Sequence, residues 1–183
     1  DAYPNHAKSN GNYANFLKEI RKDNIKAEDY YLRAIASDSN DSTNTCNYAM
    51  GLKDVKKDYD KAEDYYLKAI ALKPTNSVNI TNYAYFLKEI KKDYDKAEEY
   101  YLKAIELNCS IAMVGLGCYY YNTQREYDIA KKYFLMAINY NNENAMNYLG
   151  NYYDHIKDHE KMKKYYLMAI NYNNTNSMNC LGK

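Results

Sequence analysis

A tyrosine-rich phrase recurs along the chain and constrains its fold more than any other feature. It reads KAEDYYLRAI at 26–35, KAEDYYLKAI at 61–70 and KAEEYYLKAI at 96–105, and related versions follow at 130–138 and 162–170. Successive copies are 35, 35, 33 and 32 residues apart. A period in this range is typical of stacked supersecondary units, each of which covers the apolar face of its neighbour. We therefore expect a repeat array rather than one conventional core.

Each unit contains two segments with the spacing of an amphipathic helix. In the third unit, Ile80, Tyr83 and Leu87 share one helical face, and Ala97 and Tyr101 share a face of the next segment. Each unit is thus predicted to be a helical hairpin. An acidic residue precedes every second segment, where it would cap the helix or interact with its dipole. These residues are Asp23, Asp58, Asp93, Glu126 and Asp158.

The hairpins resemble tetratricopeptide repeats. The Leu-Gly pair of that family stands at Leu116-Gly117 and Leu149-Gly150, and Tyr120 and Tyr153 follow at the family's spacing. The phrase AMNYLGNYY at 145–153 is also similar to SEL-like repeats. Small residues occupy the close-packing positions throughout. These are Ala14, Ala49, Ala84, Gly117 and Gly150 in first segments, and Ala34, Ala69, Ala104, Ala137 and Ala169 in second segments.

The resemblance implies an all-α fold, an alpha-alpha superhelix (solenoid) of tandem helical hairpins. We expect residues 1–183 to form a single solenoid segment. Its repeats are predicted at 5–41, 42–74, 75–109, 110–142 and 143–174, with the start of a truncated sixth repeat at 175–183. Tyr3-Pro4 resembles the tail of a preceding repeat, so the chain is expected to be part of a longer array.

The chain departs from the family pattern at several positions. The tryptophan position never holds Trp, and the glycine between the two helices is absent. Repeats one to four carry one extra residue at that turn, and Met162 replaces an expected Ala. These differences leave the local geometry of the turns, and of the fifth repeat, open.

Proteins with this architecture are expected to bind an extended peptide or a partner's helix in a concave groove lined by first helices. The repeat register predicts which side chains face that groove. The candidate peptide-binding residues are Asn12, Asn15, Asn47, Met50, Asn82, Tyr85, Lys88, Cys118, Tyr121, Asn147, Tyr148 and Asn151.

The series Asn12, Asn47 and Asn82 occupies one equivalent position in three repeats. A side-chain amide can both donate and accept, so the series could hold a peptide main chain without demanding a sequence. The alternative is that asparagine is simply common in this chain, which contains 24. A complete carboxylate clamp, as in chaperone-tail receptors of the family, is not expected, since Gly11 and Val78 stand where basic residues are needed.

Charge and composition argue against several other functions. The formal charge is +1, from 25 basic and 24 acidic residues, so we expect no nucleic-acid partner and no anionic membrane. No secretory signal opens the chain, and the uncharged stretch 107–124 is too polar for a membrane span. The four cysteines form no C-x-x-C pair, which fits reduced thiols in a cytoplasmic (intracellular) protein.

Catalytic and metal-ligating residues are also not predicted. His155 and His159 lie four residues apart, but they flank a turn, and packing or surface exposure is the simpler explanation. We expect no cofactor. The sequence predicts a non-enzymatic protein–protein interaction scaffold. Two alternatives remain: a recruitment or regulatory repeat domain of a larger enzyme, and a self-associating structural array. The Asn, Lys and Tyr bias weakly resembles repeat arrays of giant viruses or AT-rich protists.

Overall fold

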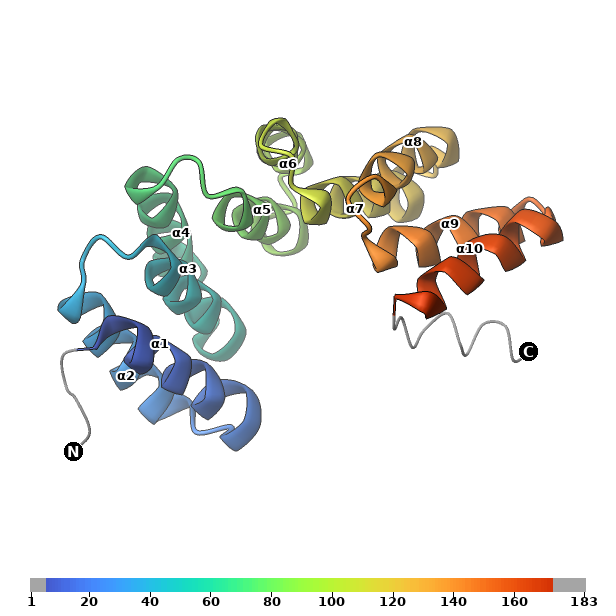
Figure 1. Cartoon of the computed structure of the whole chain (residues 1–183). Coiled ribbons are helices and arrows are strands. Elements are labelled where there is room, and N and C mark those ends of the chain that lie inside the picture. Colours follow the sequence, from blue (N-terminus) through green and yellow to red (C-terminus); the bar gives the residue numbers. More distant parts are fainter. Residues whose placement is uncertain (1–5, 173–183) are drawn as a thin grey trace. The chain divides into compact units, whose positions relative to one another are not determined.

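The computed structural model describes residues 6–172, and in this part of the chain helices pair into five hairpins (Figure 1). The first helices are α1 (Ala7–Phe16), α3 (Ser42–Gly51), α5 (Ser77–Phe86), α7 (Ser110–Tyr119) and α9 (Glu143–His155). The second helices are α2 (Asn24–Ser37), α4 (Tyr59–Leu72), α6 (Tyr94–Glu106), α8 (Tyr127–Ile138) and α10 (His159–Asn171). No strand occurs between residues 6 and 172, so the all-α prediction is confirmed. The predicted sixth repeat and the Tyr3-Pro4 tail lie outside the described residues.

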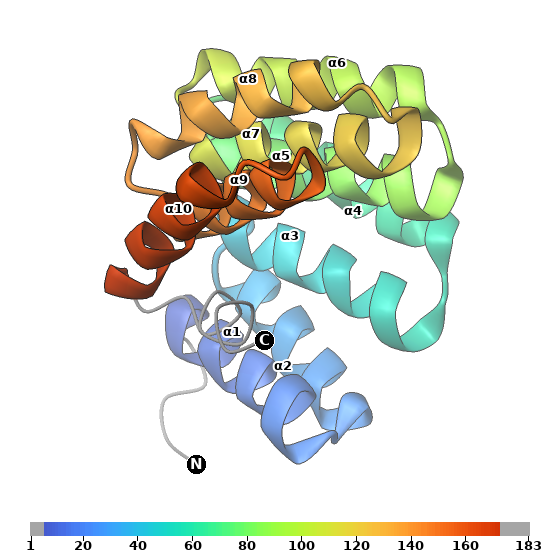
Figure 2. The same ribbon diagram turned by 90° about the vertical axis from the view of Figure 1, so that its right-hand side faces the viewer.

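The chain divides into two compact units, Asp1–Tyr100 and Tyr101–Lys183. In the first unit, α1 packs on α2 and α3 packs on α4; in the second, α7 packs on α8 and α9 packs on α10. Figures 1 and 2 show the partners of each such hairpin side by side. The two units are described separately below.

The predicted acidic caps are present at four of the five second helices. A carboxylate oxygen of Asp23 accepts a 3.2 Å hydrogen bond from the Lys26 backbone N–H, and Asp58, Asp93 and Asp158 make the equivalent bond. This hydrogen bond is the main reason that the pKa of Asp23 lies below its ordinary value. Glu126 occupies the same position, but its side chain makes no capping bond. The longer glutamate side chain is a poorer cap than aspartate.

The extra residue in the first four repeats is absorbed at the end of the first helix. A π-helical turn of five residues follows α1, α3, α5 and α7, whereas α9 runs on as a regular α-helix. These turns are η1 (Leu17–Arg21), η2 (Leu52–Lys56), η3 (Leu87–Lys91) and η4 (Tyr120–Gln124). The next residue is left-handed in each case, with φ of 55° to 60° at Lys22, Lys57, Lys92 and Arg125. Basic residues thus occupy a conformation that favours glycine.

Small residues and tyrosines form the core of the first unit. Ala14, Ala49 and Ala84 are fully buried, so neighbouring helices approach closely there. Tyr48 and Tyr83 are also buried, so tyrosine rings supply much of the aromatic core in a chain that has no Trp and three Phe. Tyr13, the equivalent residue of the first repeat, is 45% exposed. In the second unit, Leu116, Phe134 and Leu149 take the corresponding places in the core.

Candidate functional site

The first helices of the N-terminal unit lie next to one another and place several of the predicted residues on one face. The side-chain amide of Asn82 donates to the Cys46 sulfur at 3.6 Å and to the Met50 sulfur at 3.7 Å, which links α5 to α3. Asn47 and Asn82 are half-buried and Asn12 is exposed. We call this surface the first-helix face. Its predicted residues are Asn12, Asn15, Asn47, Met50, Asn82, Tyr85 and Lys88.

A stripe of lysines lies on the π-helical turns that follow these helices, with one lysine in each of the first three repeats. The side chains of Lys18, Lys53 and Lys88 are only 10%, 13% and 14% exposed. Each ammonium pairs with the carboxylate of the following residue at 2.9 to 3.0 Å. Because every lysine has an acidic neighbour, the stripe is close to neutral, and its long apolar stems contribute to packing.

Tyr85 is the exposed aromatic side chain among the predicted residues of the first-helix face. Its ring is 47% exposed and lies between two lysines, with Nζ of Lys53 at 5.3 Å and Nζ of Lys88 at 5.4 Å from its centroid. Both ammonium groups are within range of a cation–π interaction. The structure thus brings the predicted residues Tyr85 and Lys88 together and adds Lys53. The ring is held in place while much of it faces solvent.

Asn15, a predicted residue of this face, has a partly structural role, and Cys46 of α3 is buried beneath the face. Oδ1 of Asn15 accepts a 2.6 Å hydrogen bond from the Tyr31 hydroxyl, so its amide N–H groups are what it can offer a ligand. Burial raises the pKa of the Cys46 thiol to about 11, which argues against a nucleophilic role for that cysteine.

The second unit brings its five predicted residues into a cluster on α7, η4 and α9. The Tyr148 ring stacks on Phe134, with 5.1 Å between the ring centroids. Burial is the main cause that raises the pKa of Tyr148, and a hydrogen bond with Cys118 raises it further. The hydroxyl of Tyr121 donates to the backbone carbonyl of Asn151 at 3.4 Å. Tyr148 and Asn151 therefore make structural contacts within the unit, in addition to their predicted role in ligand binding. Asn147, next to Tyr148 in the sequence, is half-buried.

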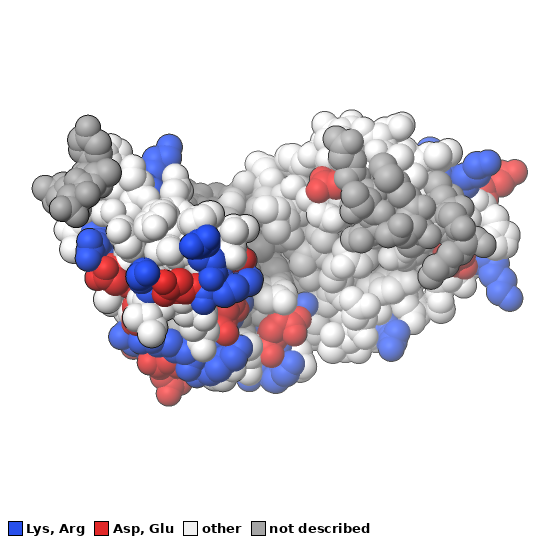
Figure 3. Space-filling model, turned by 90° about the horizontal axis from the view of Figure 1, so that it is seen from below, with Lys and Arg blue, Asp and Glu red and all other residues white. Residues whose placement is uncertain are grey.

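Charges are distributed differently over the two units. On the surface seen in Figure 3, Lys and Arg alternate with Asp and Glu over the first unit, while the second unit shows mostly uncharged residues. Neither unit presents a broad field of one sign on this surface. A polyanion would therefore find no extended basic patch there.

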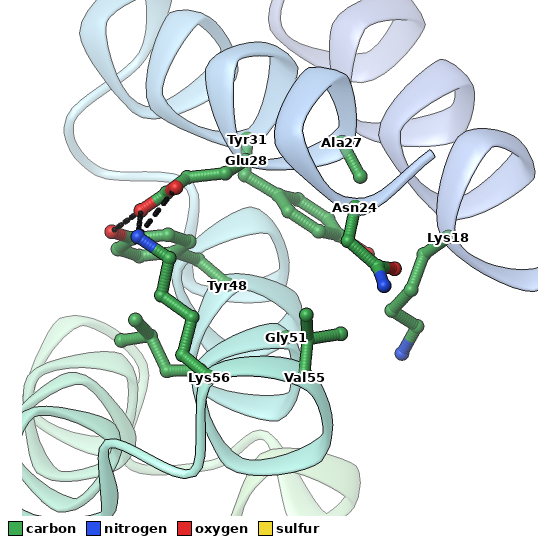
Figure 4. A pocket seen from close by; sticks show the side chains of 10 residues that line it. Lys18, Asn24, Ala27, Glu28, Tyr31, Tyr48, Gly51, Val55 and Lys56 are labelled. Carbon is green, nitrogen blue, oxygen red and sulfur yellow. Dashed lines mark hydrogen bonds and ion pairs between the residues drawn. The ribbon is translucent and has the colours of Figure 1, made fainter. Parts of the chain in front are cut away.

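A small pocket lies between the first two hairpins at Gly51 (Figure 4). Tyr31 and Tyr48 form its walls, and at its rim the Lys56 ammonium lies 2.6 Å from a Glu28 carboxylate oxygen. The pocket measures about 20 Å³, room for roughly one water molecule, so it is too small for a substrate or cofactor. This pocket was not predicted. Gly51 could have indicated it, because the equivalent position in the next repeat holds the much larger Phe86.

Two buried asparagines were also missed, although both recur at the repeat spacing. The side-chain amide of Asn44 donates to the Ala7 carbonyl, and that of Asn79 to the Ser42 carbonyl, each at 3.1 Å. Both asparagines are buried, and each ties the start of one first helix to the start of the preceding one. Their role is to fix the stacking of hairpins.

The histidines do not form a recognisable chemical site. His155 ends α9 and its ring lies 4.7 Å from that of Tyr127, while His159 begins α10. Within residues 6–172 there is no group of three or more His, Cys, Asp or Glu side chains suited to hold a metal ion. In the same range, no helix has the length and apolar character needed to cross a membrane.

Comparisons with known proteins bear on the family. Two tetratricopeptide repeat models match residues 65–99 and 144–176. Both matches support a tetratricopeptide repeat family. The first match includes α5 and η3, so the π-helical variant is recognised along with the regular fifth hairpin. No curated protein sequence matches the chain.

Solved structures show the same fold. A Sel1 repeat protein from Oxalobacter formigenes is 22% identical, with a TM-score of 0.71 over 97% of this chain and 78% of that one. PilF of Pseudomonas aeruginosa is 24% identical, with a TM-score of 0.66 over 90% and 75%. YrrB, described as a TPR protein with an unusual peptide-binding site, is 23% identical, with a TM-score of 0.52 over 88% and 84%. Together they support a tetratricopeptide or SEL-like repeat architecture.

Proposed function

We propose that this chain is a non-enzymatic interaction scaffold that binds a peptide or a partner protein on the first-helix face. The observation that carries this proposal is Tyr85, a half-exposed ring fixed between Lys53 and Lys88. An aromatic side chain that is exposed yet held in one place loses little conformational entropy on binding, and such residues often dominate interface energetics.

The surroundings of Tyr85 suit an extended polypeptide. Asn82 lies on the same helix, α5, and Asn47 lies on the neighbouring helix α3. The side-chain amide of Asn47 and the amide oxygen of Asn82 can pair with main-chain groups of a ligand. The paired lysines and acids leave little net charge, so the preferred ligand is a largely neutral segment rather than a strongly acidic one. The fold shared with YrrB, a TPR protein described as having an unusual peptide-binding site, supports the same class of ligand.

Selection from a random peptide library, followed by affinity measurements, tests this proposal. We expect Tyr85→Ala to weaken the selected peptides by about 30-fold, which corresponds to a hot-spot contribution of about 2 kcal/mol. Tyr140→Ala is the matched control, because Tyr140 is also 47% exposed but lies at the end of a second helix. Equal affinities for the wild type and Tyr85→Ala would exclude Tyr85 as the centre of the site.

A further inference from the structure

The second helices change their charge pattern between the first three repeats and the last two. In α2, the Asp29 carboxylate pairs at 2.8 Å with the guanidinium of Arg33, one helical turn further on. The next two second helices keep an acid and a base at these positions. In α8, Lys132 and Met136 stand there instead, and α10 repeats this change. A neutral pair has thus been replaced by a lysine with an uncharged residue one turn further on.

The lysines of α8 make no ion pair with any residue that the structure describes. The nearest acid one turn before Lys132 is Asp128, and its carboxylate accepts a 3.0 Å hydrogen bond from the Tyr152 hydroxyl. The Lys131 ammonium lies 5.3 Å from the ring centroid of Tyr152 and 5.7 Å from that of Tyr153. The exposed ammonium of Lys132 can therefore pair with a carboxylate from another molecule.

Tyr153 connects α10 to the same basic surface. The Lys161 ammonium lies 5.3 Å from the centroid of Tyr153, and the Tyr165 ring stacks on Tyr153 with 5.3 Å between centroids. The exposed Lys164 places its ammonium 5.6 Å from the centroid of Tyr165. Lysines of two successive second helices are thus linked through packed tyrosines. We call this surface the basic face of the second unit, and its residues are Lys131, Lys132, Leu135, Lys161 and Lys164.

An aliphatic side chain and a hollow lie among these lysines. Leu135, three residues after Lys132 on α8, is 38% exposed. A shallow hollow of about 430 Å³ follows this side of α8 and is lined by Asp128, Lys131, Lys132, Leu135, Met136 and Asn139. Figure 3 shows this unit from below, whereas α8 lies above α9 and α10 in Figure 1. The basic face thus offers positive charge and apolar contact side by side.

This side of a second helix stays uncovered when hairpins stack. Leu67 of α4 holds the position equivalent to Leu135 and is 41% exposed. Helix α4 lies inside its unit, because the first hairpin packs on α3 and α5 packs on α4. Helix α8 is likewise followed by α9, which packs against it. The exposure of Leu135 is therefore a property of the repeat and is not caused by a missing neighbour.

We propose that the basic face of the second unit is a docking surface for an acidic polypeptide segment that also carries aliphatic side chains. Carboxylates of the segment would pair with Lys132 and Lys164, and an aliphatic side chain would lie against Leu135 in the hollow. This surface lies on second helices and is separate from the first-helix face, so the two sites can be tested independently.

A nucleic acid fits this face less well. Proteins that bind single strands commonly offer exposed aromatic rings on which bases stack. Tyr152 and Tyr153 are only 5% and 6% exposed, so their rings are not free to stack on bases. The exposed apolar side chain of the face is Leu135, which suits an aliphatic residue of a polypeptide.

A second copy of the chain also fits less well, because most of its second-helix acids are already paired. Glu28 of α2 pairs with Lys56 at 2.6 Å, and Glu63 of α4 pairs with Lys91 at 2.8 Å. An acid that is paired within its own chain gains little from a further lysine. The occupant is therefore a partner whose carboxylates have no such internal base.

The probe is a fluorescently labelled peptide of repeated Glu-Glu-Leu units, titrated into the full chain. We expect binding that Lys132→Asp weakens by about ten-fold and Lys132→Gln by about three-fold. Lys132→Asp copies α4, where Asp64 holds the equivalent position. Lys68→Asp is the control, because it makes the same charge change on an exposed side chain of α4 and should leave binding unchanged.

A second peptide of repeated Glu-Glu-Ser units tests the apolar part of the surface. The wild type should bind the Glu-Glu-Leu peptide more tightly, and Leu135→Ala should abolish that preference. Leu67→Ala is the matched control, since it removes the equivalent leucine from the first unit and should keep the preference.

Four results would overturn the proposal. The first is no binding of the Glu-Glu-Leu peptide, and the second is equal binding by the wild type and Lys132→Asp. The third is a single-stranded RNA that binds more tightly than the peptide and displaces it, which would assign the face to nucleic acid. The fourth is self-association in sedimentation experiments that Lys132→Asp abolishes, which would place a second copy on the face.

Discussion

The Tyr31 hydroxyl donates a 2.6 Å hydrogen bond to Oδ1 of Asn15 and so joins the two helices of the first hairpin. The fifth hairpin contains the same contact at 2.7 Å, between Tyr166 and Asn151. In the fourth hairpin, Phe134 takes the tyrosine position and a cysteine takes the asparagine position. The hydroxyl and its acceptor are thus present or absent together in these three hairpins.

This pairing predicts a non-additive result. Tyr31→Phe should lower the free energy of unfolding by about 1 kcal/mol, the net contribution of a typical hydrogen bond. Asn15→Cys should cost about 1–3 kcal/mol, because the buried hydroxyl then loses its acceptor. The double variant copies the fourth hairpin and should cost less than the sum of the two single changes. Urea denaturation measures all three, and strict additivity would contradict the coupling.

Alkaline pH should destabilise the first unit. Burial is the main cause that raises the pKa of Tyr31 and of Tyr48 to about 12, whereas an unfolded tyrosine ionises near pH 10. The neutral phenols therefore contribute stability that is complete below pH 10 and is lost as the pH rises towards 12. Denaturation midpoints at pH 9, 10 and 11 should fall progressively. Tyr31→Phe should show a shallower fall, and an unchanged slope would exclude Tyr31 as a contributor.

Alanine substitution should have opposite effects at two glycines. A Cβ at Gly51 would lie 3.3 Å from the Tyr31 ring, a small adjustment, and alanine gains up to about 1 kcal/mol of helix propensity. A Cβ at Gly117 would lie 2.5 Å from the Phe134 ring, so something must move. We expect Gly51→Ala to raise the melting temperature and Gly117→Ala to lower it by overpacking worth about 1–3 kcal/mol. The same direction at both sites would contradict the packing described.

The left-handed residue after each π-helical turn provides another test. Lys92 has φ of 57°, which disfavours residues with a Cβ, so Lys92→Gly should stabilise the chain by up to about 1 kcal/mol. Lys92→Val should destabilise it, since β-branched residues avoid this conformation. As a control, Lys68→Gly lies inside α4 and should cost about 1 kcal/mol. Thermal unfolding of the three variants distinguishes these outcomes.

The repeat period predicted most of the fold because it fixes both the helix phase and the small contact positions. Asp23 and its equivalents could be recognised as caps for the same reason. The π-helical turns could not be predicted, since an inserted residue can either lengthen the turn or form a bulge in the helix. Which of the two forms depends on the backbone hydrogen bonds that each allows, and periodicity does not specify these.

The candidate site was predictable only in part. The register predicted that Tyr85 and Asn82 share one helix and one face, but it could not show that Lys53 of the preceding repeat would reach the Tyr85 ring. The exposure of Tyr13 could not be predicted from periodicity, because the same sequence pattern occurs whether or not another repeat packs against that side of the hairpin. Side-chain contacts such as Asn15 with Tyr31 depend on rotamers that periodicity does not specify.

The most direct test of the scaffold function is an NMR titration of the full chain with a library-selected peptide, observing the side-chain amide groups of asparagine. We predict that the signals of Asn47 and Asn82 shift on binding, while that of Asn108, which lies in an exposed turn, does not. Shifts that avoid both Asn47 and Asn82 would contradict peptide binding on the first-helix face.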